Sequence, residues 1–223
     1  PGVDGINFLQ SHAHLHLIDI LMNTIHTPCL VGDIGGTNAR FALADPDTSS
    51  LSHILTLSTT QHNNLKEAIQ TYLSEVKAPS VRRACVAIAN PIEGDVLRMT
   101  NTDWVFSIED TRTQLQLDEL RMLNDWEAMA LAVPLLGADD LEQIGQGTPR
   151  ANAPKALLGA GTGLRVSALV RARSGEWVPI AGEGGHVTLS PTTPREADLL
   201  RVLWKTWPHV SAERVVSGMG CLL

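Results

Sequence analysis

The chain has 223 residues, of which 43% are hydrophobic and 18% charged, and this is enough to bury a core or two modest lobes. Its formal net charge of -7 and its lack of a basic cluster argue against nucleic acid as a partner. No apolar run approaches the roughly 18 residues that a membrane-spanning helix needs, so we expect no membrane segment.

The cysteines indicate the redox compartment. The chain has 3 of them, Cys29, Cys85 and Cys221, far apart in the sequence and in apolar surroundings. No Cys-x-x-Cys pair occurs, so the spacing predicts neither a zinc site nor a disulfide framework. A reducing cytoplasm fits this pattern best, and we expect a cytoplasmic protein.

Residues 1–27 differ from the rest of the chain. They lack the basic region of a secretory signal peptide, and Met22 offers a plausible native start shortly before the first expected strand. Three alternating histidines lie here, but nothing nearby would orient their rings for a metal. We therefore expect residues 1–27 to be an appended or disordered leader.

Strands and amphipathic helices alternate from residue 29 onward, which predicts an α/β fold. Apolar residues at helical spacing predict one helix, and Ser107 followed by Asp110 predicts the capped start of another. In chain order, the expected strands are 29–34, 38–44, 51–58, 81–89, 95–99, 104–106 and 119–124, and the expected helices are 61–77, 107–116 and 125–136.

A stretch rich in Gly, Pro and Asn, residues 145–154, precedes a second section rich in β-structure. Here we expect a meander of strands, a helix that begins at Thr193-Pro194, where proline fits the first turn, and a last helix over Ser211–Val216 that ends at Gly218. So few helices would leave the second sheet thinly covered, and we expect a truncated chain. The expected strands are 155–160, 165–172 and 176–181, and the helix at Thr193 runs to about 206.

The segment GDIGGTNAR, residues 32–40, is the first candidate for chemistry. It lacks the Gly-Lys-Ser/Thr of a Walker loop, and it leads into a strand rather than the helix of a dinucleotide-binding fingerprint. It therefore predicts a hairpin turn whose glycines let backbone N–H groups approach an anion, with Asp33 placed for a magnesium ion. A plain hairpin turn with a solubilising acid is the alternative.

A second glycine turn, GAGTG at residues 159–163, comes after another strand and repeats this design. Two such turns in successive α/β sections are a more specific signal than either alone. A triphosphate held between two lobes needs a cradle from each side, so the pair predicts a nucleotide site.

Five polar residues stand at the ends of elements or among glycines. Each has an ordinary alternative: Asp125 as a helix N-cap, His186 in a loose loop, Glu213 as a solvated helical residue. Taken together, they provide several acceptors that could read polyol hydroxyls by paired hydrogen bonds. The five are Asn124, Asp125, Glu183, His186 and Glu213.

The chain resembles bacterial glucokinase, of the hexokinase/actin-like ATPase superfamily, over about residues 28–220. The resemblance implies a two-lobed, ribonuclease H-like α/β fold with the active site in the cleft. It also implies a small lobe over 28–136 and the first part of an incomplete large lobe over 137–223. The segments that carry it are GDIGGTNAR, AIANPIEGD, MTNTDWVFS, LNDWEAMALAVP, GAGTGL, GEGGHV and HVSAERVVSG.

The resemblance further implies ATP-dependent phosphorylation of glucose at its 6-hydroxyl, with Mg²⁺ as cofactor and a homodimer as the assembly. Asp125 would be the base that takes the hydroxyl proton, and Asp33 the magnesium-associated acid. Glucose contacts would come from Asn124, Asp125, Glu183, His186 and Glu213, and phosphate contacts from Asp33, Gly35, Gly36, Thr37, Asn38, Thr162 and Gly163.

The sequence departs from the family pattern at two places. Arg165 stands where the family has the last glycine of GAGTGLG, and SGMGC at 217–221 replaces SGPGL. These departures keep a second interpretation open, a non-catalytic sugar-binding remnant of a truncated kinase. A sugar-sensing repressor fits less well, because residues 1–27 are too short and not basic enough for a DNA-binding segment.

Overall fold

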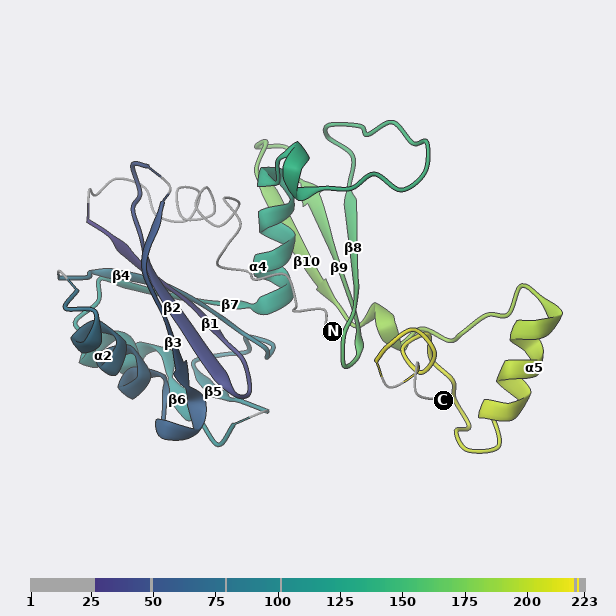
Figure 1. Ribbon diagram of the computed structural model, residues 1–223, viewed down its shortest axis with the longest axis horizontal. Helices are drawn as coiled ribbons and strands as arrows, with labels where there is room; N and C mark the ends of the chain where they lie inside the picture. Colours follow the sequence, from purple (N-terminus) through teal and green to yellow (C-terminus); the bar gives the residue numbers. More distant parts are fainter. Residues whose placement is uncertain (1–26, 49, 79, 101, 219, 221–223) are drawn as a thin grey trace. The chain divides into compact units, whose positions relative to one another are not determined.

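The computed structural model describes residues 27–48, 50–78, 80–100, 102–218 and 220 (Figure 1). Almost all of the expected leader, residues 1–26, lies outside this part of the chain. Contacts divide the chain into two compact units, the first ending at Gly147 and the second beginning at Thr148. The α/β fold class is confirmed, and no helix in the described part is long and apolar enough to cross a membrane.

A five-stranded mixed sheet forms the centre of the first unit, in the order β3-β2-β1-β4-β7. β1 pairs with β2 antiparallel, whereas β1, β4 and β7 run parallel to one another. The carboxyl ends of these parallel strands therefore meet at one edge, with Ile34, Ile88 and Asn124 in register. The strands are β1 (Cys29–Ile34), β2 (Asn38–Ala44), β3 (Leu51–Ser58), β4 (Arg83–Ile88) and β7 (Glu119–Asn124).

The main core lies between one face of this sheet and the elements that cover it, α2 (Leu65–Glu75), β5 (Val96–Arg98), β6 (Val105–Ser107) and α3 (Ile108–Gln114) (Figure 1). α2 is shorter than the expected helix over 61–77. Its start is delayed because Asn64 caps the Glu67 N–H, and a single 3₁₀ turn, η2 (Thr59–Gln61), precedes it. The core-facing residues of α2 are Leu65, Ala68, Ile69 and Tyr72.

The other face of the sheet carries a small apolar cluster that includes both described cysteines, Cys29 and Cys85. Burial raises the pKa of each thiol to about 12. Because the thiolate is the reactive form, these two side chains act as small apolar residues of the core. After β7 the first unit continues through α4 (Asp125–Ala132), η3 (Val133–Leu135) and η4 (Ala138–Asp140).

The second unit is built on the expected meander, β8 (Lys155–Ala160), β9 (Leu164–Arg171) and β10 (Trp177–Gly182), in the order β10-β9-β8. The 3₁₀ turn η5 (Gly184–His186) comes next, and then α5 (Pro194–Leu203), where Thr193 and Glu196 form a capping box. Leu200 and Leu203 of α5 pack with Val210 in a separate small core.

The expected helix over Ser211–Val216 is wrong. These residues form successive turns, with bonds from the Arg214 N–H to the Ser211 carbonyl (3.1 Å) and from the Val215 N–H to the Ala212 carbonyl (3.1 Å). Hydrogen bonds with neighbouring loops hold the segment at both ends. A six-residue helix is marginal in isolation, so these tertiary contacts decide its conformation.

Candidate active site

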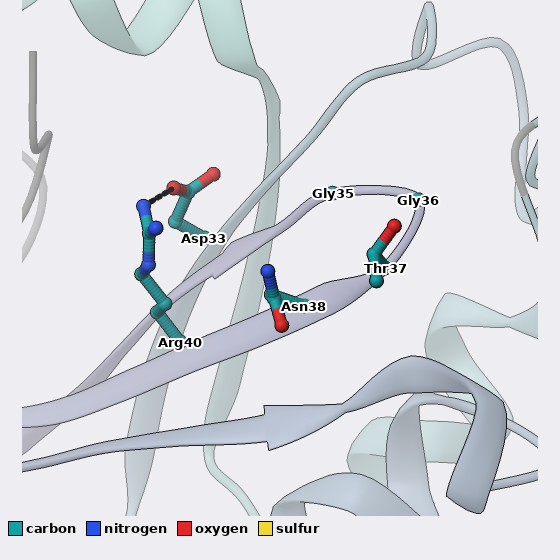
Figure 2. A pocket seen from close by; sticks show the side chains of 6 residues that line it. All are labelled: Asp33, Gly35, Gly36, Thr37, Asn38 and Arg40. Atoms are coloured by element: carbon teal, nitrogen blue, oxygen red, sulfur yellow. Dashed lines mark ion pairs between the residues drawn. The ribbon is translucent and has the colours of Figure 1, made fainter. Parts of the chain in front are cut away.

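The turn between β1 and β2 borders a cavity of about 290 Å³ in the first unit (Figure 2). A hydrogen bond from the Gly35 N–H to the Asn38 carbonyl (2.9 Å) closes the turn. Thr59 supports it from β3's end, since its N–H donates to the Thr37 carbonyl (3.0 Å) and its hydroxyl to the Gly36 carbonyl (2.8 Å). The cavity is lined by Asp33, Gly35, Gly36, Thr37, Asn38 and Arg40, so the five predicted residues of this segment come together, with Arg40 beside them.

Asp33 and Arg40 face each other across the strand pair at this cavity, with 4.0 Å between the carboxylate and guanidinium (Figure 2). Burial raises the pKa of Asp33, Arg40 opposes that shift, and the negative charge of Asp125 adds to it. Asp125 therefore acts electrostatically on Asp33, although β4 lies between β1 and β7 in the sheet. A nearby cation would stabilise the charged form of this partly buried acid.

Asn124 and Asp125 lie where β7 passes into α4. The cap of α4 is Asn124, whose side chain accepts from the Trp126 N–H (3.0 Å) and whose N–H donates to Glu127 (3.1 Å). Asp125 is therefore the first residue of the helix rather than its N-cap, and its carboxylate accepts from the Trp126 N–H at 2.9 Å. The ordinary alternative for Asp125, a helix N-cap, is thus removed.

Asn90 belongs to this region, and sequence reasoning missed it. Its side chain is 7% exposed, donates to the Arg98 carbonyl (3.2 Å) and accepts from the Thr100 N–H (3.2 Å). Its own carbonyl accepts from the side-chain amide of Asn124 (3.0 Å). Asn90 therefore fixes the orientation of Asn124. The only signal in the sequence is an Asn-Pro pair after a buried strand, which indicates a simple strand end.

A second cavity of the first unit, about 670 Å³, shares Gly36 with the first. Its lining is rich in hydroxyl groups, which come from Thr59, Thr60, Thr100 and Thr102. The indole N–H of Trp104, another lining residue, donates to the His62 carbonyl (2.8 Å), so a partly buried hydrogen bond holds this wall of the cavity.

In the second unit, the turn between β8 and β9 contains the second glycine segment. The Gly161 N–H donates to the Gly163 carbonyl (2.8 Å), with Thr162 between them. The carboxylate of Glu213 accepts a hydrogen bond from the Leu164 N–H at 3.0 Å. A β-carbon added at Gly163 would lie 2.5 Å from that carboxylate, so glycine is needed for this approach.

The glycines around His186 have a packing role. β-Carbons at Gly184 and Gly185 would lie 2.8 Å from Val166 and 1.9 Å from the Leu164 carbonyl, so η5 sits directly on β9. Arg165 points to the opposite face of β9, because side chains alternate along a strand.

His186 lies between two acids. Its ring nitrogens are 3.7 Å from Glu183 and 3.9 Å from Glu213. Glu183 and His186 are exposed, while Glu213 is 28% exposed. The structure thus brings the three predicted sugar contacts of the second unit together, next to the second glycine turn.

Comparisons with known proteins show the fold and the family. Solved structures that share the actin-like ATPase fold of this chain include sugar kinases and a transcriptional regulator of the ROK family. A glucokinase from an Antarctic psychrotroph superposes with a TM-score of 0.80 at 36% identity, over 88% of this chain and 62% of that one. The family model described as glucokinase matches residues 30–223, and the chain belongs to this family.

Curated relatives give the same result. The glucokinase of Aromatoleum aromaticum is 52% identical over 196 residues, 87% of this chain and 59% of that protein. The glucokinase of Ralstonia nicotianae is 48% identical over 197 residues, 86% of this chain and 57% of that protein. The chain therefore spans a little under three fifths of the length of these relatives.

Proposed function

We propose that this chain is part of an enzyme that transfers the terminal phosphoryl group of ATP to the 6-hydroxyl of glucose. The observation that carries this proposal is the edge of the first unit's sheet, where Asp33 and Asp125 act on each other beside a glycine turn. Membership of the glucokinase family and the names of its relatives support glucose as the substrate.

On the phosphate side, the β1–β2 turn would offer backbone and side-chain donors to the phosphates, and Arg40 a positive charge. In the described part of the chain, no group of three or more His, Cys, Asp or Glu residues could enclose a metal. Asp33 fits Mg²⁺ in another way, as one half-buried carboxylate that would share the ion with phosphate oxygens and water. Mg²⁺ bound there would neutralise charge on the phosphates.

On the sugar side, Asn124 and Asp125 would face the reacting hydroxyl, and Asp125 would accept its proton as general base. Asn90 would keep the Asn124 amide in place through its carbonyl. Glu183, His186 and Glu213 would bind further hydroxyls, and Thr162 and Gly163 would contact the nucleotide phosphates. Phosphoryl transfer suits such a site, because positioning and charge stabilisation supply most of the catalysis.

We further propose that residues 28–136 belong to a small lobe and residues 137–223 to the first part of a large lobe. A homodimer and a cytoplasmic location are parts of the same proposal. The homodimer rests on the family alone. The cytoplasmic location rests on the few, widely spaced cysteines of the sequence, which suit a reducing compartment.

Asp125→Asn tests the proposal in the full-length protein. The isosteric amide cannot accept the proton, so turnover should fall by about a thousandfold while glucose affinity changes little. A coupled assay for glucose 6-phosphate and calorimetric titration with glucose measure the two quantities. Turnover like that of the wild type would refute the role of Asp125, and a wild type that binds glucose without turnover would favour the sugar-binding remnant.

A further inference from the structure

The segment from Ser211 to Gly218 joins two loops of the second unit. At its start, the N–H groups of Ala212 and Glu213 donate to the carbonyls of Val187 (2.8 Å) and Gly185 (2.9 Å). At its end, the Gly218 N–H donates to the Gly161 carbonyl (2.7 Å). The segment therefore connects η5, which holds His186, to the glycine turn between β8 and β9.

The side chain of Glu213 makes the same connection with one carboxylate. Oε2 accepts from the Leu164 N–H at 3.0 Å, at the end of the glycine turn. Oε1 lies 3.9 Å from Nδ1 of His186. The two oxygens belong to one planar group, so a displacement of Oε2 from the Leu164 N–H also displaces Oε1.

We propose that the Leu164 N–H holds the carboxylate of Glu213, a sugar contact, in the orientation that accepts a sugar hydroxyl, so that the glycine turn positions this contact. This inference rests on the proposed sugar-kinase function and extends it. It makes the geometry of a phosphate-binding turn a determinant of sugar affinity, although the turn itself contacts no sugar.

This arrangement has a thermodynamic consequence. A phosphate-bearing ligand that moves the β8–β9 turn changes the orientation of Glu213, and thereby the affinity for the sugar. Linkage then requires the sugar to change the affinity for that ligand by the same factor. The two binding events are coupled inside the second unit.

The glycine turn offers a matched pair of variants. A β-carbon at Gly163 would lie 2.5 Å from Oε2 of Glu213 and would push the carboxylate off the Leu164 N–H. A β-carbon at Gly161, two residues earlier in the same turn, meets no atom within 4 Å. Neither glycine is among the described residues with positive φ, so alanine is compatible with the backbone at both positions.

The measurement is the dissociation constant for glucose without nucleotide, by calorimetric titration of the full-length protein. Gly161→Ala should bind glucose like the wild type, and Gly163→Ala should bind it about tenfold more weakly, the effect expected from losing a hydrogen bond to a charged group. Equal affinities of the two variants would overturn the inference. Failure of the wild type to bind glucose would instead overturn the proposed function, and the inference with it.

A second measurement needs no variant, and it decides the question if Gly163→Ala does not fold. In protein labelled with ¹⁵N-leucine, glucose should shift the amide resonance of Leu164, whose N–H donates to Glu213. The amide of Leu169, on the same strand and fully buried, is the control and should stay in place. An unmoved Leu164 resonance at saturating glucose would contradict the proposed role of Glu213.

Discussion

The two glycine turns have similar sequences but are held in place differently. In the first, between β1 and β2, Thr59 bonds to two carbonyl oxygens of the turn, at Gly36 and Thr37. In the second, between β8 and β9, an acidic side chain accepts from a backbone N–H, because Glu213 bonds to Leu164. The first turn is thus supported through its acceptors. The second is supported through an acceptor, because the Gly218 N–H donates to the Gly161 carbonyl, and in addition through a donor, the Leu164 N–H.

Because of this difference, we expect the two turns to bind an anion in different ways. Support through carbonyl oxygens fixes the first turn without placing a negative charge on its amides, and Arg40 adds a positive charge beside the cavity. The backbone N–H groups of such a turn can bind an anion without a rearrangement of the turn. The second turn already has a carboxylate at Leu164, so its contact with an anion depends on where Glu213 lies. We therefore expect the first turn to bind phosphate in a fixed geometry, and the second in a geometry that depends on the position of Glu213.

Of the variants that test this difference between the turns, Asp33→Asn, in the cavity of the first turn, should have the largest effect. The variant keeps the size of the side chain but loses the charge that Mg²⁺ would need, so turnover should fall by about a hundredfold or more. Asp45→Asn is the control, because Asp45 is an exposed acid after the far end of β2. Similar activity of the two variants would remove Asp33 from the phosphate site.

The same variant has a stability signature with a defined sign. The pKa of Asp33 in the folded chain is raised above 3.8, so its contribution to stability is present below that pH and lost as pH rises through the raised value. Asparagine does not titrate. The melting temperature of Asp33→Asn minus that of the wild type should therefore increase as the pH is raised from acidic to neutral. A difference that does not change with pH would contradict the raised pKa of Asp33.

A smaller effect, confined to the second unit, is expected from Gly185→Ala. The new β-carbon would lie 1.9 Å from the Leu164 carbonyl, and the backbone there must move, at a cost of about 3 kcal/mol. Gly182→Ala is the control, because its nearest contact is an ordinary 3.7 Å. Amide hydrogen exchange should accelerate in residues 148–218 and stay unchanged in the first unit. Uniform acceleration would show that the units do not respond independently.

The smallest effect is expected from Thr59→Val, which removes the hydroxyl that bonds to Gly36 and keeps the shape of the buried side chain. The loss should be about 1 kcal/mol of unfolding free energy, measured by urea denaturation. Thr60→Val, at an exposed neighbour, should change stability less. Equal losses would mean that the bond to Gly36 does not support the first turn.

Sequence patterns predicted the strands well, and all of those expected are present within a few residues. Apolar runs and alternation are local, so they can be read without knowing the fold. The grouping of Asp33 with its turn, and of Glu183 with His186, could be predicted from short spacings for the same reason.

The features that could not be predicted depend on long-range contacts. The bond from Leu164 to Glu213 joins residues 49 positions apart, and that from Asn124 to Asn90 joins residues 34 apart. The wrong helix over Ser211–Val216 lies in a segment with similar long-range bonds, because the N–H groups of Ala212 and Glu213 donate to the carbonyls of Val187 and Gly185. The spacing of apolar residues indicates only the conformation that a segment can adopt by itself. In Ser211–Val216, hydrogen bonds with neighbouring loops determine the conformation instead.

The position of the first glycine turn also has a consequence for how the chain folds. β1 finds its antiparallel partner β2 only three residues later, whereas its parallel partner β4 lies about fifty residues away along the chain. Hairpins close in about 1–10 μs, and pairing across long loops is slower. We therefore expect the β1–β2 hairpin to form early, so that the residues proposed to hold phosphate also begin the assembly of the sheet.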